Sequence, residues 1–192
     1  MSTLPAGPLT SGLSAAILAA GLVNAAKPPS ASLEPRVLDV LALYGYPLVP
    51  PFLFSKVYMS REGFERNAIK GTANVKYWLR VYLVEGLLAL EELNEEGWQV
   101  MEELAKFGLD FDESATIAVG IQRGIRNVML YRKEARSVAR RIGLEPWGPK
   151  KILAYACIRG LLDKSEMLKI CSLEFDIRDM PKYLALEYRL EQ

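Results

Sequence analysis

The chain has 192 residues, of which 51% are apolar and 24% are charged, and its formal net charge is +1. A chain of this length buries roughly 70% of its extended surface, so we expect one globular domain with a packed core. The absence of histidine excludes Ser-His-Asp and Cys-His catalysis, imidazole metal ligands and a histidine general base.

The rest of the composition narrows the chemistry further. Cys157 and Cys171 are too few for a four-thiolate metal site, and we expect them as reduced thiols of a cytoplasmic protein. No glycine-rich phosphate loop of standard spacing occurs, which leaves carboxylates with a hard divalent cation, or Lys and Tyr chemistry, as routes to catalysis. The sequence has only five Asn and three Gln, a depletion typical of thermophilic proteins.

Residues 1–32 form an extension rich in Ala, Gly, Ser and Pro, with no charged side chain before Lys27. Its apolar stretch from Leu13 to Val23 is too short to span a bilayer, and no membrane partner is expected. We expect an Ala-rich helix that packs on the domain, with a targeting signal and a mobile arm as the alternatives. The domain itself is expected over residues 33–192.

In the first half of this domain, the spacing of apolar residues and the helix-end signals predict helices around short strands. The expected elements are a helix over 37–44, a strand over 56–59, a helix from Ser60 to Gly71, a strand or helix over 77–84, and a helix over 87–107 that Gly97 splits.

The second half alternates helices and strands with short connections. The expected elements are a helix capped by Asp112 and ending at Arg123, a strand over 127–131, a helix over 133–142, a strand over 144–147, a helix from Pro149 to Arg159, and a tail of two helices with a turn near 176–180. Strands joined in this way run parallel through right-handed crossovers. The fold class is therefore expected to be α/β and helix-rich.

Charge is distributed unevenly along the chain. From Glu85 to Glu113 there are ten acidic residues and one basic residue, whereas from Ile121 to Lys164 there are eleven basic and three acidic residues. Helical spacing places most of the basic residues between 132 and 140 on one face, which predicts contact with RNA phosphates. The candidate RNA-binding residues are Arg132, Lys133, Arg136, Arg140, Lys150 and Lys151, with Tyr131 and Trp147 as candidates for base stacking. A solvated helix face is the alternative.

Several segments together resemble a known family. They are DESATIAV at 112–119, VMLYRKEARSVARRIGL at 128–144, IRGLL at 158–162 and FSKVYMS at 54–60. In order and spacing they are similar to PIN domains, in the branch that includes VapC-type nucleases. The resemblance implies an α/β/α sandwich around a short, mostly parallel sheet. It also implies a ribonuclease whose three or four carboxylates bind Mg²⁺ or Mn²⁺, and partners such as RNA, a second copy or an antitoxin-like protein.

Compared position by position, the chain departs from the family at its metal ligands. The first acid falls on Glu34, with Asp39 as the other candidate, and the second falls on Glu65 or beside it on Arg66. The third falls on Ala115.

Two further departures concern the third and fourth acids. Glu113 lies two residues before the third position, and two residues turn a helix by about 200°, so we expect Glu113 to face away from that site. The fourth position belongs to an aspartate pair, which is replaced here by Tyr131 and Arg132. The fixed charge of Arg132 repels a metal cation.

The resemblance therefore implies a degenerate member of the family. We expect a protein without nuclease activity and without a bound cofactor, acting as an RNA-associated or protein-interaction module. The alternative is an active ribonuclease of the toxin–antitoxin type that requires Mg²⁺ or Mn²⁺. Its candidate catalytic residues are Glu34, Asp39, Glu65 and Glu113, for each of which a helix cap or a surface charge is the competing interpretation.

Overall fold

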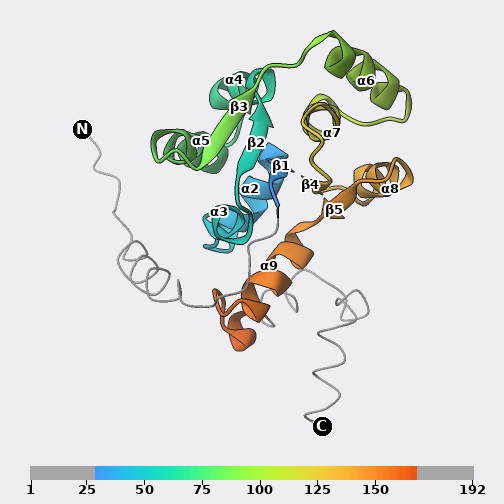
Figure 1. Ribbon diagram of the computed structural model, residues 1–192. Helices are drawn as coiled ribbons and strands as arrows, with labels where there is room; N and C mark the ends of the chain where they lie inside the picture. The colour runs from blue at the N-terminus through green and yellow to red at the C-terminus, as the bar shows by residue number, and fades with distance from the viewer. Residues whose placement is uncertain (1–28, 168–192) are drawn as a thin grey trace, which may run out of the picture.

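The central feature of the fold is a five-stranded sheet, all of whose strands are parallel (Figure 1). The computed structural model describes residues 29–167, and the sheet order within them is β3-β2-β1-β4-β5. The strands are β1 (Ala31–Leu33), β2 (Val57–Ser60), β3 (Leu88–Glu91), β4 (Asn127–Met129) and β5 (Glu145–Trp147). The expected helix-rich α/β class is confirmed, and helices on both faces are consistent with an α/β/α sandwich.

The helices are α2 (Pro35–Leu43), α3 (Val49–Leu53), α4 (Arg61–Lys70), α5 (Ala73–Val84), α6 (Glu95–Lys106), α7 (Phe111–Gln122), α8 (Lys133–Arg141) and α9 (Pro149–Ile158). Side chains alternate across the sheet, as the pleat requires. Leu33, Met59 and Met129 pack with α2, α3, α5 and α9 on one face. Tyr58 and Val128 face the opposite side, which α7 and α8 cover, and α6 packs outside α7.

Two sequence-based boundaries are wrong. The run 87–107 is not one helix, because Leu88–Glu91 pairs with β2 as strand β3. Helix α6 begins only at Glu95, where the side chain of Asn94 accepts a hydrogen bond from the amide of Gly97 at 2.8 Å. The N-cap of α7 is Asp110 and not Asp112. The ambiguous run 77–84 lies in helix α5.

Some expectations fall on residues 1–28 and 168–192, which lie outside the described part of the chain. They are the Ala-rich helix, the turn near 176–180, the final helix and the state of Cys171. Ala31 and Ser32, which the sequence analysis assigned to the extension, form β1 together with Leu33. Within residues 29–167, no helix combines the length and the apolar character needed to cross a membrane.

Gly120 allows α7 to lie directly against the sheet. A Cβ atom built there would be 2.9 Å from Cγ1 of Val128 and 3.2 Å from the carbonyl oxygen of Ile125. Both neighbours are fixed, one in strand β4 and the other in the backbone before it. The helix can therefore approach this closely only because residue 120 has no side chain.

We predict that Gly120→Ala lowers the free energy of unfolding by about 1–3 kcal/mol, because the extra methyl overpacks the interface between helix and sheet. Urea denaturation measures the effect. Gly97→Ala is the comparison, since its new methyl meets only side-chain atoms, of Gln122, Leu93 and Asn94, and no backbone or strand. If Gly120→Ala is as stable as the wild type, the close packing of α7 on β4 is contradicted.

Candidate functional site

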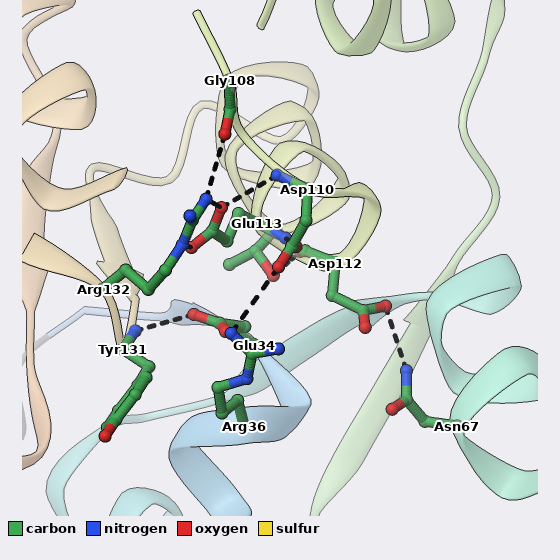
Figure 2. A network of polar contacts seen from close by, with 10 residues as sticks. Glu34, Arg36, Asn67, Gly108, Asp110, Asp112, Glu113, Tyr131 and Arg132 are labelled. Atoms are coloured by element: carbon green, nitrogen blue, oxygen red, sulfur yellow. Dashed lines mark hydrogen bonds and ion pairs between the residues drawn. The ribbon is translucent and has the colours of Figure 1, made fainter. Parts of the chain in front are cut away.

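The candidate site lies at the carboxyl ends of β1 and β4. The chain extends the sheet from β1 through β2 to β3 and then returns to the other side of β1 with β4. In open α/β sheets, ligands bind outside the strand ends at this kind of switch point. Glu34 follows β1 and Tyr131 follows β4, and the amide of Tyr131 donates to Oε2 of Glu34 at 2.7 Å (Figure 2).

Glu34 is an enclosed carboxyl. Its side chain is 1% exposed, and Oε1 has no hydrogen-bond partner among the described residues. Burial raises the pKa of Glu34 to about 8; the hydrogen bond from Tyr131 opposes this shift, and the negative charge of Glu113 adds to it. At neutral pH most of the molecules therefore carry a protonated Glu34 as long as no cation is bound beside it.

We predict that Glu34→Gln stabilises the protein increasingly as pH rises from about 5 to 8. Over this range unfolded Glu34 is ionised while folded Glu34 keeps its proton, so the wild type loses up to ~1.4 kcal/mol of stability per pH unit through this group. The variant lacks this titration. Urea denaturation of both proteins across the range measures the difference, and a difference that does not change with pH would contradict the shifted pKa.

Glu113 holds two structural elements together at this edge. Its carboxylate accepts a hydrogen bond from the amide of Asp110 at 2.9 Å, while the Asp110 side chain accepts from the Glu113 amide at 3.0 Å, forming a capping box on α7. Both Glu113 oxygens also bind the guanidinium of Arg132, which donates further to the carbonyl of Gly108 at 3.1 Å. Burial alone would raise the pKa of Glu113, but hydrogen bonds from Arg132 and Asp110 lower it below its ordinary value.

The structure places three of the residues that stand at or near the family's metal-ligand positions. Ala115 is buried in the cluster around Tyr58. Glu113, which we expected to face away, lies close enough to Glu34 for its charge to affect the Glu34 pKa. Arg132 lies at the end of β4 and engages both oxygens of Glu113, and this bond raises the pKa of Arg132.

Four residues of this network were missed by sequence reasoning. Arg36 of α2 forms an ion pair with Asp110, with 3.7 Å between Nη1 and Oδ2. Asn67 of α4 donates to Oδ1 of Asp112 at 3.0 Å, and burial raises the pKa of Asp112 (Figure 2). One local signal was available, because Asp110 and Glu113 have the spacing of a capping box. Asn67 and Asp112 are marked only by their positions beside Glu65, Arg66 and Glu113.

The remaining candidate carboxylates do not join the cluster. Asp39 accepts a hydrogen bond from Oγ1 of Thr72 at 2.8 Å, and Glu65 is exposed on α4. Within residues 29–167, no group of three or more His, Cys, Asp or Glu side chains is arranged to hold a metal ion. Because both oxygens of Glu113 are engaged by the guanidinium of Arg132 and too few carboxylates are gathered beside it, these residues do not fit Mg²⁺ or Mn²⁺.

We predict that Arg132→Ala lowers the free energy of unfolding by about 1–3 kcal/mol, because it leaves the buried carboxylate of Glu113 without its cation. Adding Glu113→Gln should restore part of the loss, since a neutral amide is cheaper to bury. Urea denaturation of both variants measures this, with Arg126→Ala, an exposed arginine, as the control. Equal stability of Arg132→Ala and Arg126→Ala would contradict the role of the ion pair.

Beside this cluster is a hollow that we call the basic pocket. It has a volume of about 400 Å³ and is lined by Tyr131, Arg132, Lys133, Arg136, Arg140, Pro146, Gly148, Pro149, Lys150 and Lys151. All six residues that the sequence analysis selected as RNA-binding candidates thus line one pocket. Arg132 lies in the connection between β4 and α8. Lys133, Arg136 and Arg140 come from helix α8, and Lys150 and Lys151 come from the first turn of helix α9.

The cations of the basic pocket are held to different degrees. Arg136 donates to the carbonyl of Tyr131 and, at 3.3 Å, to that of Leu130; burial and then the charge of Arg140 lower its pKa. Lys151 pairs with Glu145, and its ammonium lies 4.2 Å from the centre of the Trp147 ring. The charge of Arg140 thus acts on Arg136 from the same helix, so this side of the basic pocket has two neighbouring positive charges, which would favour a bound anion.

Only one of the two candidate stacking residues is accessible. Trp147 is 4% exposed, its Nε1 donates to Oδ1 of Asn127 at 3.0 Å, and its ring contacts Phe54 and Tyr155 edge-on. The prediction that Trp147 stacks on a base is therefore wrong, since the tryptophan is part of the core. Tyr131 is 39% exposed and lines the basic pocket.

No family model and no curated protein matches this chain. The resemblance to PIN domains therefore stays a prediction that rests on the segments quoted above. The fold and the site geometry carry the functional argument.

Proposed function

We propose that this protein is a degenerate PIN-like module that binds RNA through the basic pocket and does not cleave it by a metal-dependent reaction. The observation that carries the proposal is the convergence of six Arg and Lys side chains on one pocket at the carboxyl edge of the sheet. None of the residues described as lining it is acidic.

The energetics of such a pocket favour a phosphate ligand. Each cation that neutralises a phosphate releases a counterion, which makes binding strong at low salt and weak at high salt. Lys133 and Arg140 are exposed, so they are open to a ligand arriving from solvent. The half-exposed ring of Tyr131 adds a surface on which a base can stack.

The alternative of an active ribonuclease has weaker support. Metal-assisted cleavage requires several oxygen ligands around a divalent cation. At this edge Arg132 neutralises Glu113, Asn67 binds Asp112 and Arg36 pairs with Asp110. The protein's own cations and amide thus engage the carboxylates that a metal would need.

We predict salt-dependent binding of single-stranded RNA, measured by fluorescence anisotropy across a range of salt concentrations. Lys133→Gln and Arg140→Gln should each weaken binding and reduce the slope of log affinity against log salt by about 1. Lys76→Gln, an exposed lysine of α5 outside the basic pocket, should change neither. Equal losses in all three variants would show that binding is diffuse and would contradict the proposed site.

We also predict that the same RNA stays intact in Mg²⁺ or Mn²⁺, as followed by denaturing gel electrophoresis. The carboxylates of the edge lack the arrangement that a catalytic cation requires. Manganese-dependent cleavage that disappears in Glu34→Gln or Glu65→Gln would overturn this part of the proposal and establish the nuclease alternative.

A further inference from the structure

We propose that the basic pocket recognises a phosphate monoester, supplied by the phosphorylated end of an RNA strand. This inference rests on the proposed RNA-binding function and narrows its ligand from the backbone in general to one terminal group.

The charge of the basic pocket exceeds what one internal phosphate needs. Six of its ten lining residues are Arg or Lys, and none of these ten is Asp or Glu. Arg132 and Lys151 are paired with Glu113 and Glu145, and Lys133, Arg136 and Arg140 of α8 alone supply three further positive charges. A phosphodiester carries one negative charge, whereas a phosphate monoester carries about 1.5 to 2 at neutral pH and presents three acceptor oxygens. The excess of cations therefore suits the doubly charged group.

The arrangement of these cations also favours an end over a continuous strand. A strand lying across a surface contacts cations set out along a track. Here the cations surround one hollow of about 400 Å³, which lies between two neighbouring strand–helix connections. A hollow of this volume is within the range of small-molecule pockets, so it has room for a terminal nucleotide together with its phosphate.

Two helix N-termini add positive potential to the basic pocket. Arg132 is the N-cap of α8 and Gly148 is the N-cap of α9, and both line the basic pocket. Neither N-cap has a side chain bonded to the first amides of its helix, and the partial positive charge of those helix ends favours an anion. The helix ends thus reinforce the side-chain cations.

Tyr131 explains why the phosphate should belong to a nucleotide. Its amide donates to Glu34 and its carbonyl accepts from Arg136, so the backbone is held on both sides, while the residue is 39% exposed and lines the pocket. The last base of a strand has a stacking neighbour on one side only. Its open face can therefore lie on the Tyr131 ring while its phosphate enters the pocket.

The test compares three RNA oligonucleotides of one sequence, each labelled away from the end under test, in anisotropy titrations with the full chain. One has a 5′-phosphate, one a 3′-phosphate, and one has hydroxyls at both ends. We expect one phosphorylated end to bind at least about tenfold more tightly than the hydroxyl ends. The double variant Lys133→Gln/Arg140→Gln should lose most of this preference, and Lys76→Gln should keep it. Adenosine monophosphate, but not adenosine, should compete.

The outcomes separate this inference from the proposed function. Equal affinity for all three oligonucleotides overturns the terminal-phosphate inference and leaves RNA binding intact. Binding of adenosine monophosphate in preference to adenosine, without binding of any oligonucleotide, supports the phosphate pocket but ends the RNA-binding proposal. A phosphate preference that the double variant retains places recognition elsewhere and overturns the inference. Thermal unfolding of each variant confirms that it is folded.

Discussion

The ion pair between Arg132 and Glu113 is the interaction on which the rest of this edge depends. Glu113 caps α7 through Asp110, and Arg132 begins α8, so their contact joins two helices that pack on the same face of the sheet. The pair also lies near Glu34, whose pKa the charge of Glu113 raises further. An arginine therefore performs at this position the neutralising role that a metal cation performs in carboxylate clusters, and it does so as a permanent part of the chain.

The position of Arg132 also matters for the neighbouring basic pocket. Arg132 both binds Glu113 and lines the basic pocket, so the acidic cluster and the cationic lining meet at one residue. The remaining acids of the cluster are paired internally, Asp110 with Arg36 and Asp112 with Asn67. Arg36 balances the charge of Asp110, whereas the neutral amide of Asn67 gives Asp112 a hydrogen bond only.

Much of the fold could be predicted from the sequence where local signals were strong. The short strands and helices after residue 123 were predicted nearly to their ends, since glycines with positive φ, such as Gly124 (65°) and Gly143 (84°), end their helices. Strand β3 was missed because its pairing with β2 is a tertiary interaction that residues 87–107 alone do not reveal.

In the candidate site, too, residues that are close in sequence could be grouped in advance, whereas contacts between distant segments could not. The six basic residues share one short region of sequence, so helical spacing was enough to group them. Arg36, Asn67 and Asp110 contact their partners across the fold, and no local pattern links α2, α4 and the start of α7. The burial of Trp147 could not be predicted either, because its partners Phe54 and Asn127 come from other parts of the chain.

The place of β1 in the middle of the sheet also governs how the chain must assemble. β1 is the first strand of the described chain, yet one of its two neighbours is β4, and Glu34 and Tyr131 are 97 residues apart in sequence. During synthesis from the N-terminus, one side of β1 has its strand partner only after most of the domain has left the ribosome. Closure of that long loop carries a large entropic cost before any contact repays it. We therefore expect the pairing of β1 with β4, and the contact between Glu34 and Tyr131, to form late in folding.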